Sequence, residues 1–151
     1  MAIKGINEVI AEIKKLGKQA IQDIEDETEA IAKQIELDAK SNAPADLGKL
    51  GQSIISYKQD DLNWVIEART SVAPYAPYIE FGTGGLVEVP AELQEMAIQF
   101  KGKGIKQVNL LPRPYLYPAL LKGRKDYLKR LKIIVKKYSK WLILTNTFEK
   151  Q

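Results

Sequence analysis

The residues of this sequence that could carry out chemistry are carboxylates and lysines, because the chain contains no histidine and no cysteine. Their absence excludes thiol nucleophiles, disulfides, Cys/His zinc sites and any mechanism that uses imidazole as a general base. The densest run of carboxylates is Asp23, Glu25, Asp26, Glu27 and Glu29, along one predicted helix. A two-metal nuclease needs carboxylates that converge from separate elements. We therefore interpret the run as a solvated helix face and predict no metal and no cofactor.

Glu80 is a carboxylate of a different kind, because it is the only charge in the aromatic segment Tyr75–Phe81. A carboxylate in apolar surroundings normally needs a partner, and Arg113 or Arg69 could supply one. We predict a structural pairing or an interface contact for Glu80, not catalysis. The glycines that follow, at 82–85, do not form a phosphate loop, since neither Gly-Lys-Ser/Thr nor a GxGxxG spacing is present.

Positive charge is concentrated near the C-terminus. The chain has a net charge of +4, and residues 122–151 contain ten Lys/Arg and two Asp/Glu. Three interpretations stay open for this segment: a solvated face or one that pairs with the acidic stretch 23–29 in the same chain or a neighbour, a contact with a partner protein, and transient contact with DNA. No helix-turn-helix, zinc-finger or RNA-binding signature predicts sequence-specific reading.

The elements that must position these residues are those of a single domain over 1–151. The longest apolar run, Trp141–Leu144, is too short to span a membrane, and the segment after Met1 does not resemble a signal peptide, so we expect a cytosolic product at synthesis. Apolar residues at three- and four-residue steps predict a long amphipathic helix over 1–41 that bends at Gly17. Its apolar stripe either covers the chain's own sheet or packs on another subunit.

A sheet-containing core is predicted over 42–121. Gln52–Lys58 and Leu62–Thr70 read as an antiparallel hairpin with one buried face. A two-turn helix within 74–85 should have its prolines in the first turn and stop at Gly82, and Pro90–Gln99 should form another short helix, followed by a mobile basic loop at 101–104 and extended segments up to Pro114.

A basic helix is predicted over 118–142, and 143–151 is expected to be a frayed tail. Its expected apolar stripe is Leu121, Leu128, Leu131, Val135, Tyr138 and Leu142. The predicted fold class is α+β, with a long N-terminal amphipathic helix and a C-terminal basic helix packed on a small, mainly antiparallel β-sheet.

Three blocks of sequence occur in a distinctive order. They are Ala43-Pro44-Ala45-Asp46-Leu47-Gly48-Lys49-Leu50-Gly51-Gln52-Ser53-Ile54, Tyr75-Ala76-Pro77-Tyr78-Ile79-Glu80-Phe81-Gly82-Thr83, and Arg113-Pro114-Tyr115-Leu116-Tyr117-Pro118-Ala119. In this order the chain resembles the tail-completion and head–tail joining (neck) proteins of long-tailed bacteriophages, described as morphogenesis proteins or minor tail components. It departs from them in having Leu47 where they usually have Thr and in a longer connection over 84–111.

The resemblance implies a non-enzymatic virion assembly protein at the head–tail junction, made in the host cytoplasm and forming a ring, expected to be a hexamer. Its implied partners are further copies of itself, the head connector on the portal side, the tail terminator or tail-tube proteins, and genomic DNA in the channel. Neither a membrane nor a small-molecule substrate is implied. The alternative is a small basic nucleic-acid-binding protein that uses its C-terminal helix.

The resemblance also implies roles for particular residues. Structural or interface roles are expected for Asp46, Gly48, Leu50, Ser53, Tyr75, Tyr78, Ile79, Glu80, Phe81, Gly82, Thr83, Arg113, Pro114 and Tyr115. Four of these should anchor the short helix to the sheet, namely Tyr75, Tyr78, Ile79 and Phe81. Gly82 should stop that helix, and Glu80 with Thr83 should fix the loop that follows. Candidate contacts with DNA or a partner are Lys101, Lys103, Lys122, Arg124 and Lys125.

Overall fold

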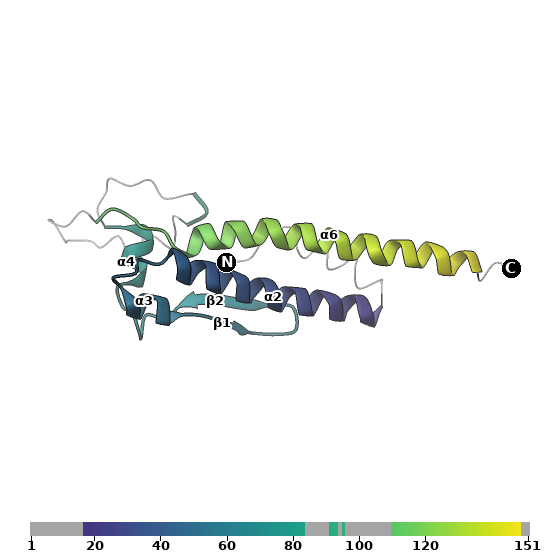
Figure 1. Cartoon of the computed structure of the whole chain (residues 1–151), viewed down its shortest axis with the longest axis horizontal. Helices are drawn as coiled ribbons and strands as arrows, with labels where there is room; N and C mark the ends of the chain where they lie inside the picture. Colours follow the sequence, from purple (N-terminus) through teal and green to yellow (C-terminus); the bar gives the residue numbers. More distant parts are fainter. Residues whose placement is uncertain (1–16, 84–90, 94, 96–109, 149–151) are drawn as a thin grey trace.

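The computed structural model describes residues 17–83, 91–93, 95 and 110–148. In chain order its elements are α2 (Lys18–Asn42), α3 (Gly48–Ser53), β1 (Ile54–Lys58), β2 (Trp64–Ala68), α4 (Ala76–Phe81), the 3-10 turn η2 (Ala91–Leu93) and α6 (Leu116–Phe148). Two long helices and a small antiparallel sheet confirm the predicted α+β class (Figure 1).

Helix α2 begins directly after Gly17, whose backbone has a φ of 92°. Residues with a side chain rarely adopt this conformation, whereas glycine does so readily. The predicted break at Gly17 is therefore confirmed, while the part of the predicted helix before residue 17 lies outside the described residues. The helix ends at Asn42, and Ala43 is extended, as expected for the residue before Pro44.

The two strands form the predicted hairpin, with Ile54 opposite Ala68 and Ser56 opposite Ile66. Ile54 and Ser56 are buried, whereas Tyr57, which lies on the other face because strand side chains alternate, is 42% exposed. The hairpin thus has one packed face and one open face, as predicted. It starts later than expected because Gln52 and Ser53 belong to α3.

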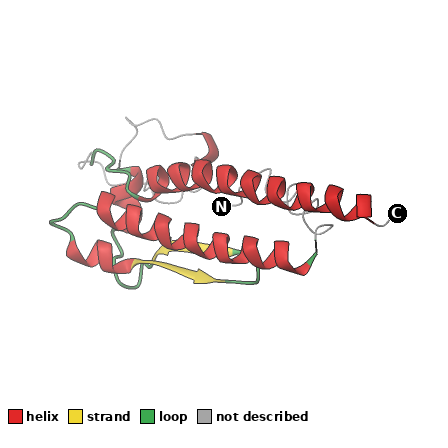
Figure 2. Cartoon of the chain, turned by 45° about the vertical axis from the view of Figure 1, so that its right-hand side comes forward, coloured by secondary structure: helices red, strands yellow, loops and turns green. Residues whose placement is uncertain are grey.

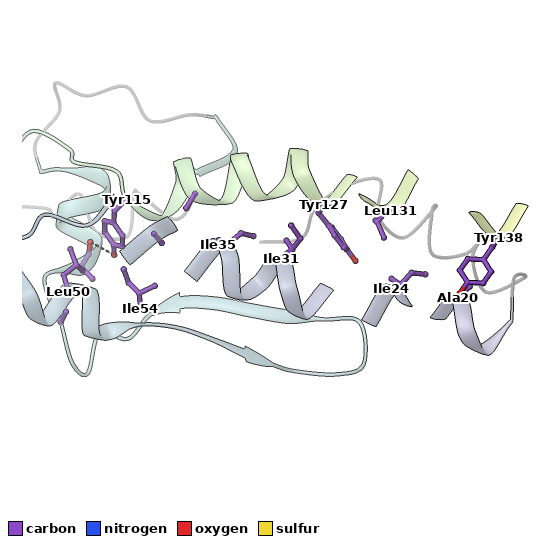
Figure 3. Close-up of a cluster of buried hydrophobic side chains, with 14 residues drawn as sticks. Ala20, Ile24, Ile31, Ile35, Leu50, Ile54, Tyr115, Tyr127, Leu131 and Tyr138 are labelled. Carbon is purple, nitrogen blue, oxygen red and sulfur yellow. Dashed lines mark hydrogen bonds between the residues drawn. The ribbon is translucent and has the colours of Figure 1, made fainter. Parts of the chain in front are cut away.

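Helix α2 lies in the middle of the molecule, between the hairpin on one side and α6 on the other (Figures 1 and 2). The helices α2 and α6 run antiparallel, because Asp38 near the end of α2 bonds Lys122 and Asp23 near its start bonds Lys137. Their shared core contains Ala20, Ile24, Ile31 and Ile35 from α2 and Ala119, Tyr127, Leu131 and Tyr138 from α6 (Figure 3).

The apolar stripe predicted for α6 is partly wrong. Leu131 and Tyr138 are buried as expected, but Leu121 is 37% exposed. Its place in the contact is taken by Gly123, where an added Cβ would lie 2.5 Å from Cδ1 of Ile35. The face of α6 that meets α2 thus includes a glycine, so a stripe chosen from large apolar residues is rotated away from the real contact. Leu142 lies beyond the side chains that the structure describes.

Helix α6 begins two residues earlier than predicted and continues to Phe148. The earlier start is compatible with Pro118, because a proline in the first helical turn lacks an N–H that would have no partner within the helix. The expectation of a frayed tail over 143–151 is wrong for 143–148, which are helical. Of the predicted helix Pro90–Gln99, residues 91–93 form a single 3-10 turn, and the basic loop at 101–104 lies outside the described residues.

Candidate functional site

The three sequence blocks meet at the end of the molecule where α2 finishes and α6 begins. Leu50 and Ile54 from the first block, Ala76 from the second and Tyr115 from the third are all at most 2% exposed and share one core cluster. The Tyr115 hydroxyl lies 3.5 Å from the carbonyl oxygen of Ala76, and burial, with the nearby charge of Glu80, raises the pKa of that hydroxyl. The blocks therefore form one packed unit.

Glu80 joins the second block to the third. Its Oε2 accepts the backbone N–H groups of Tyr115 (2.9 Å) and Leu116 (3.0 Å), and its Oε1 accepts that of Tyr117 (2.9 Å). The first N–H groups of a helix have no partner within the helix, and the positive end of the helix dipole attracts a carboxylate. Glu80, only 8% exposed, is thus the cap of α6. These N–H groups take the place of the predicted arginine partners, Arg113 or Arg69.

Gly82 ends α4, with a φ of 69°. A Cβ at this position would lie 2.5 Å from the carbonyl oxygen of Leu110 and 3.0 Å from the nitrogen of Pro112. Both the backbone conformation and the neighbouring chain thus require glycine here. The adjoining Thr83 donates its N–H to Leu110 and accepts the Leu110 N–H with its hydroxyl, both at 3.0 Å.

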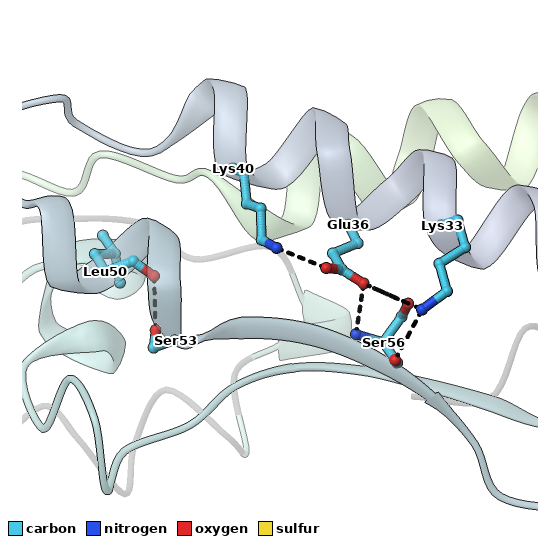
Figure 4. A network of polar contacts seen from close by, with 6 residues as sticks. All are labelled: Lys33, Glu36, Lys40, Leu50, Ser53 and Ser56. Carbon is cyan, nitrogen blue, oxygen red and sulfur yellow. Dashed lines mark hydrogen bonds and ion pairs between the residues drawn. The ribbon is translucent and has the colours of Figure 1, made fainter.

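The first block is built around Leu50, which is fully buried. Ser53, also buried, donates its hydroxyl to the carbonyl oxygen of Leu50 at 2.7 Å (Figure 4). Gly48 and Asp46 are exposed, and a Cβ added at Gly48 would meet nothing within 4 Å. Gly48 therefore has no steric reason of its own to be glycine.

The predicted structural and interface residues divide by exposure. Those that the structure buries are Leu50, Ser53, Glu80, Phe81, Gly82 and Tyr115; those at the surface are Asp46, Gly48, Tyr78, Arg113 and Pro114; Tyr75, Ile79 and Thr83 are half-buried. Six of these fourteen residues are thus buried and five lie at the surface.

A carboxylate that the sequence analysis missed, Glu36, ties α2 to the hairpin. It accepts the backbone N–H of Ser56 at 2.8 Å, the Ser56 hydroxyl, and a hydrogen bond from Lys40 at 2.6 Å (Figure 4). Burial opposes ionisation of Glu36, but the hydrogen bonds from Lys40 and Ser56 outweigh it and lower the pKa of this carboxyl to about 2. Nothing in the sequence spacing distinguishes Glu36 from other helical glutamates.

Electrostatic contacts connect α2 to α6. Lys137 donates to Asp23 at 2.9 Å and Lys122 to Asp38 at 2.7 Å, and Arg130 pairs with Glu27. Hydrogen bonds from Lys137, Tyr138 and Gln19 lower the pKa of Asp23 to about 2. Part of the acidic run thus neutralises part of the basic helix within one chain, which is one of the three interpretations left open above.

Among the described residues, the other cations of α6 form no ion pair with α2. Lys125, Lys129, Lys132, Lys136 and Lys140 are exposed and recur at intervals of four, three, four and four residues. This spacing places them on one face, away from the buried Tyr127, Leu131 and Tyr138. We call these five residues the lysine stripe. Of the contacts with DNA or a partner expected from sequence, Lys125 belongs to the stripe, Arg124 is half-buried, Lys122 pairs with Asp38, and Lys101 and Lys103 lie outside the described residues.

The opposite side of the molecule is acidic. Residues 17–83 contain twelve Asp/Glu and six Lys/Arg, whereas α6 contains nine Lys/Arg and one Asp. Glu25, Asp26 and Glu29 on α2 and Asp60 and Asp61 in the hairpin turn form no ion pair with α6 in the described structure; we call these five the acidic surface. The hairpin turn lies beneath the N-terminal half of α2 in both views (Figures 1 and 2).

Two further observations concern metal binding and membrane spanning. Within the described residues, no group of three or more carboxylates is placed to hold a metal ion. The same part of the chain contains no helix with the length and apolar character needed to cross a membrane.

Comparison with known proteins identifies one family. Residues 7–82, about half of the chain, match the model of the HK97-gp10-like family, whose description reads "Bacteriophage HK97-gp10, putative tail-component". The match includes the first block and the second block up to Gly82, and it ends before the third block. No curated protein and no solved structure matches the chain.

Proposed function

We propose that this chain, which belongs to the HK97-gp10-like family of bacteriophage tail components, is a non-enzymatic assembly protein that completes the tail and joins it to the head. It would act as a ring, expected to be a hexamer, at the neck of the virion. Its neighbours would be the connector on the portal side and the tail-terminator or tail-tube proteins. The chain would be made in the host cytoplasm before it enters the virion.

The observation that carries this proposal is that residues of the three sequence blocks form contacts within the protein itself. Glu80, Gly82 and Tyr115 all form contacts within one end of the molecule, where α4 meets the start of α6. Residues with this role fix a shape, and a fixed shape is what a protein that fits between two larger assemblies must present. Exposed members of the same blocks, such as Asp46 and Arg113, would then contact neighbours.

Unlike surfaces on opposite sides of the subunit support the ring. A contact between two different patches is heterologous, and it closes into a ring when the rotation between neighbours permits. A subunit with a basic α6 side and an acidic α2–hairpin side has the asymmetry that such a contact needs.

The test is deletion of the gene from the phage or prophage that carries it. We expect DNA-filled heads and separate tails in negative-stain images, with infectivity restored by the wild-type gene supplied in trans. Joined, infectious particles made without the protein would contradict the proposal. A magnesium-dependent nuclease assay on the purified chain would test its non-enzymatic character, and we expect no cleavage.

A second candidate function, nucleic-acid binding through α6, is favoured by the lysine stripe alone. Lys122, Arg130 and Lys137 form ion pairs with α2. The lysine stripe would therefore be the part of α6 that contacts the phosphates of DNA. Affinity for duplex DNA that falls steeply with salt while the protein stays monomeric would favour this function.

A further inference from the structure

We propose that the lysine stripe of one subunit docks on the acidic surface of a second copy of the same chain, so that subunits associate head to tail. This inference rests on the proposed function and deepens it, because it names the two faces that would meet around the ring. The occupant is a second copy because the chain itself carries the complementary charge on its opposite side.

The lysine stripe is unusual for a face that serves only solubility. A surface that serves only solubility is expected to intersperse charges of both signs, whereas α6 contains nine Lys/Arg and one Asp. The one acidic residue on α6, Asp126, lies 3.5 Å from Lys129. From Lys125 to Lys140 the stripe extends for about 22 Å at the helical rise of 1.5 Å per residue. It can therefore meet several opposite charges at once.

The cations of α6 fall into two groups, one that pairs with α2 and one, the lysine stripe, that faces away from it. Those on the inner side have acidic partners on α2 at close distance, such as Asp23 for Lys137 at 2.9 Å and Asp38 for Lys122 at 2.7 Å. The stripe presents an equivalent row of cations outward. A second α2 offers the same chemistry from outside through Asp26 and Glu29, which are exposed and form no ion pair within the described residues.

The acidic surface is exposed and carries the charge opposite to that of the lysine stripe. Glu29 is exposed, and the Asp61 side chain, which contacts Lys58, is 84% exposed. Apolar side chains accompany both faces, with Tyr57 on the hairpin 42% exposed and Ile133 beside the stripe 67% exposed. Protein interfaces commonly place apolar contacts within a polar rim, so charge need not act alone.

The lysine stripe and the acidic surface lie on opposite sides of the subunit. Helix α2 separates the two faces, with α6 on one side and the hairpin on the other (Figure 1). Each subunit can then use its stripe toward one neighbour and its acidic surface toward the next. Such a contact cannot satisfy both faces in an isolated pair, so it favours a closed ring or a filament over a dimer.

The first experiment measures absolute mass by light scattering over a concentration series at low and high salt. We expect a discrete oligomer at low salt and an apparent dissociation constant that rises by on the order of tenfold or more at high salt, since screening weakens exposed ion pairs. A wild-type chain that stays monomeric at every concentration and salt would overturn the proposal.

Two charge-reversal variants provide the decisive test. One carries Lys129→Glu, Lys132→Glu and Lys136→Glu; the other carries Glu25→Lys, Glu29→Lys and Asp61→Lys. Each should fold, as judged by circular dichroism and melting, and each should be monomeric alone. An equimolar mixture should again form the oligomer, because the reversed stripe of one meets the reversed acidic surface of the other. The mixture also controls for net charge.

Other outcomes are equally informative. If a folded stripe variant keeps the wild-type mass, or if the mixture fails to assemble, the proposed contact is wrong. If the stripe variant loses affinity for a 30-base-pair duplex while its mass is unchanged, the stripe binds nucleic acid instead. Supplying each variant in trans to the gene deletion separates the two proposals: a monomeric variant that restores head–tail joining overturns this contact and leaves the neck function standing.

Discussion

Glu80 caps a helix that begins 36 residues later in the chain, and its carboxylate accepts a 2.9 Å hydrogen bond from the backbone N–H of Tyr115, the residue before that helix. The same carboxylate accepts the N–H groups of Leu116 and Tyr117. A short helix, α4, thereby holds the start of the longest helix, α6.

Replacing Glu80 by glutamine should destabilise the protein strongly. The amide keeps one acceptor oxygen but turns an N–H donor toward the N–H groups of α6, and it removes the charge that the helix terminus favours. We expect a loss of about 2 kcal/mol or more in the free energy of unfolding, measured by urea denaturation. Glu95→Gln, at an exposed position outside the acidic surface, is the matched control and should change stability little. Equal stability of the two variants would contradict the capping role.

Replacing Gly82 by alanine should cost about 3 kcal/mol, because the backbone is in the left-handed region and the new Cβ would lie 2.5 Å from the Leu110 carbonyl oxygen. Gly48→Ala is the control, since a Cβ there meets open space and alanine favours a helix. It should be neutral or stabilise by up to about 1 kcal/mol. A shared melting temperature for the two variants would refute this assignment.

Replacing Gly123 by alanine should have two opposite effects on the stability of the protein. Alanine should favour the helix by about 1 kcal/mol, but its Cβ would overlap the Ile35 side chain, 2.5 Å from Cδ1. Overpacking of a core typically costs about 1–3 kcal/mol, so we expect a net loss of stability.

A double-mutant cycle isolates this contact. In an Ile35→Ala background the obstructing atoms are gone, and Gly123→Ala should become neutral or stabilising. If Gly123→Ala has the same effect in both backgrounds, the two helices do not approach each other at this point as described.

The sequence was sufficient for features that local chemistry determines. Gly17 and Gly82 were expected to break their helices, and both have a positive φ. The hairpin was found from its alternating pattern and its polar turn, where Asp60 accepts the N–H of Asn63. These signals depend on only a few neighbouring residues, so they do not depend on how distant parts of the chain pack.

Features that depend on distant contacts were not predictable in the same way. Glu80 was expected to need a partner, but arginine side chains were the visible candidates, because backbone N–H groups leave no mark in a sequence. The stripe of α6 was misplaced since Gly123 and Tyr127 did not look like core residues. Tyr127 is buried because its hydroxyl bonds that of Thr28 at 2.6 Å, a pairing visible only once the helices are placed together.

Acid should destabilise the protein through Glu36 and Asp23. Both carboxyls have a folded pKa of about 2, below the ordinary values of 4.5 and 3.8. A carboxyl with a depressed folded pKa binds fewer protons in the folded than in the unfolded state between the two values, so its contribution is present above the unfolded pKa and is lost as pH falls through the folded pKa. We therefore expect the free energy of unfolding to fall between about pH 4.5 and pH 2.

The variant Glu36→Gln assigns part of this slope to one residue. It removes the titrating group while keeping an acceptor for Ser56, so stability should be lower at pH 7 and should vary less with pH from 4.5 to 2. Ser56→Ala, which removes only the hydroxyl donor to Glu36, should raise the pKa of Glu36 and move the acid transition to higher pH. Urea denaturation at each pH measures both effects. An unchanged slope in Glu36→Gln would mean that the contact between α2 and the hairpin does not depend on the charge of this carboxylate.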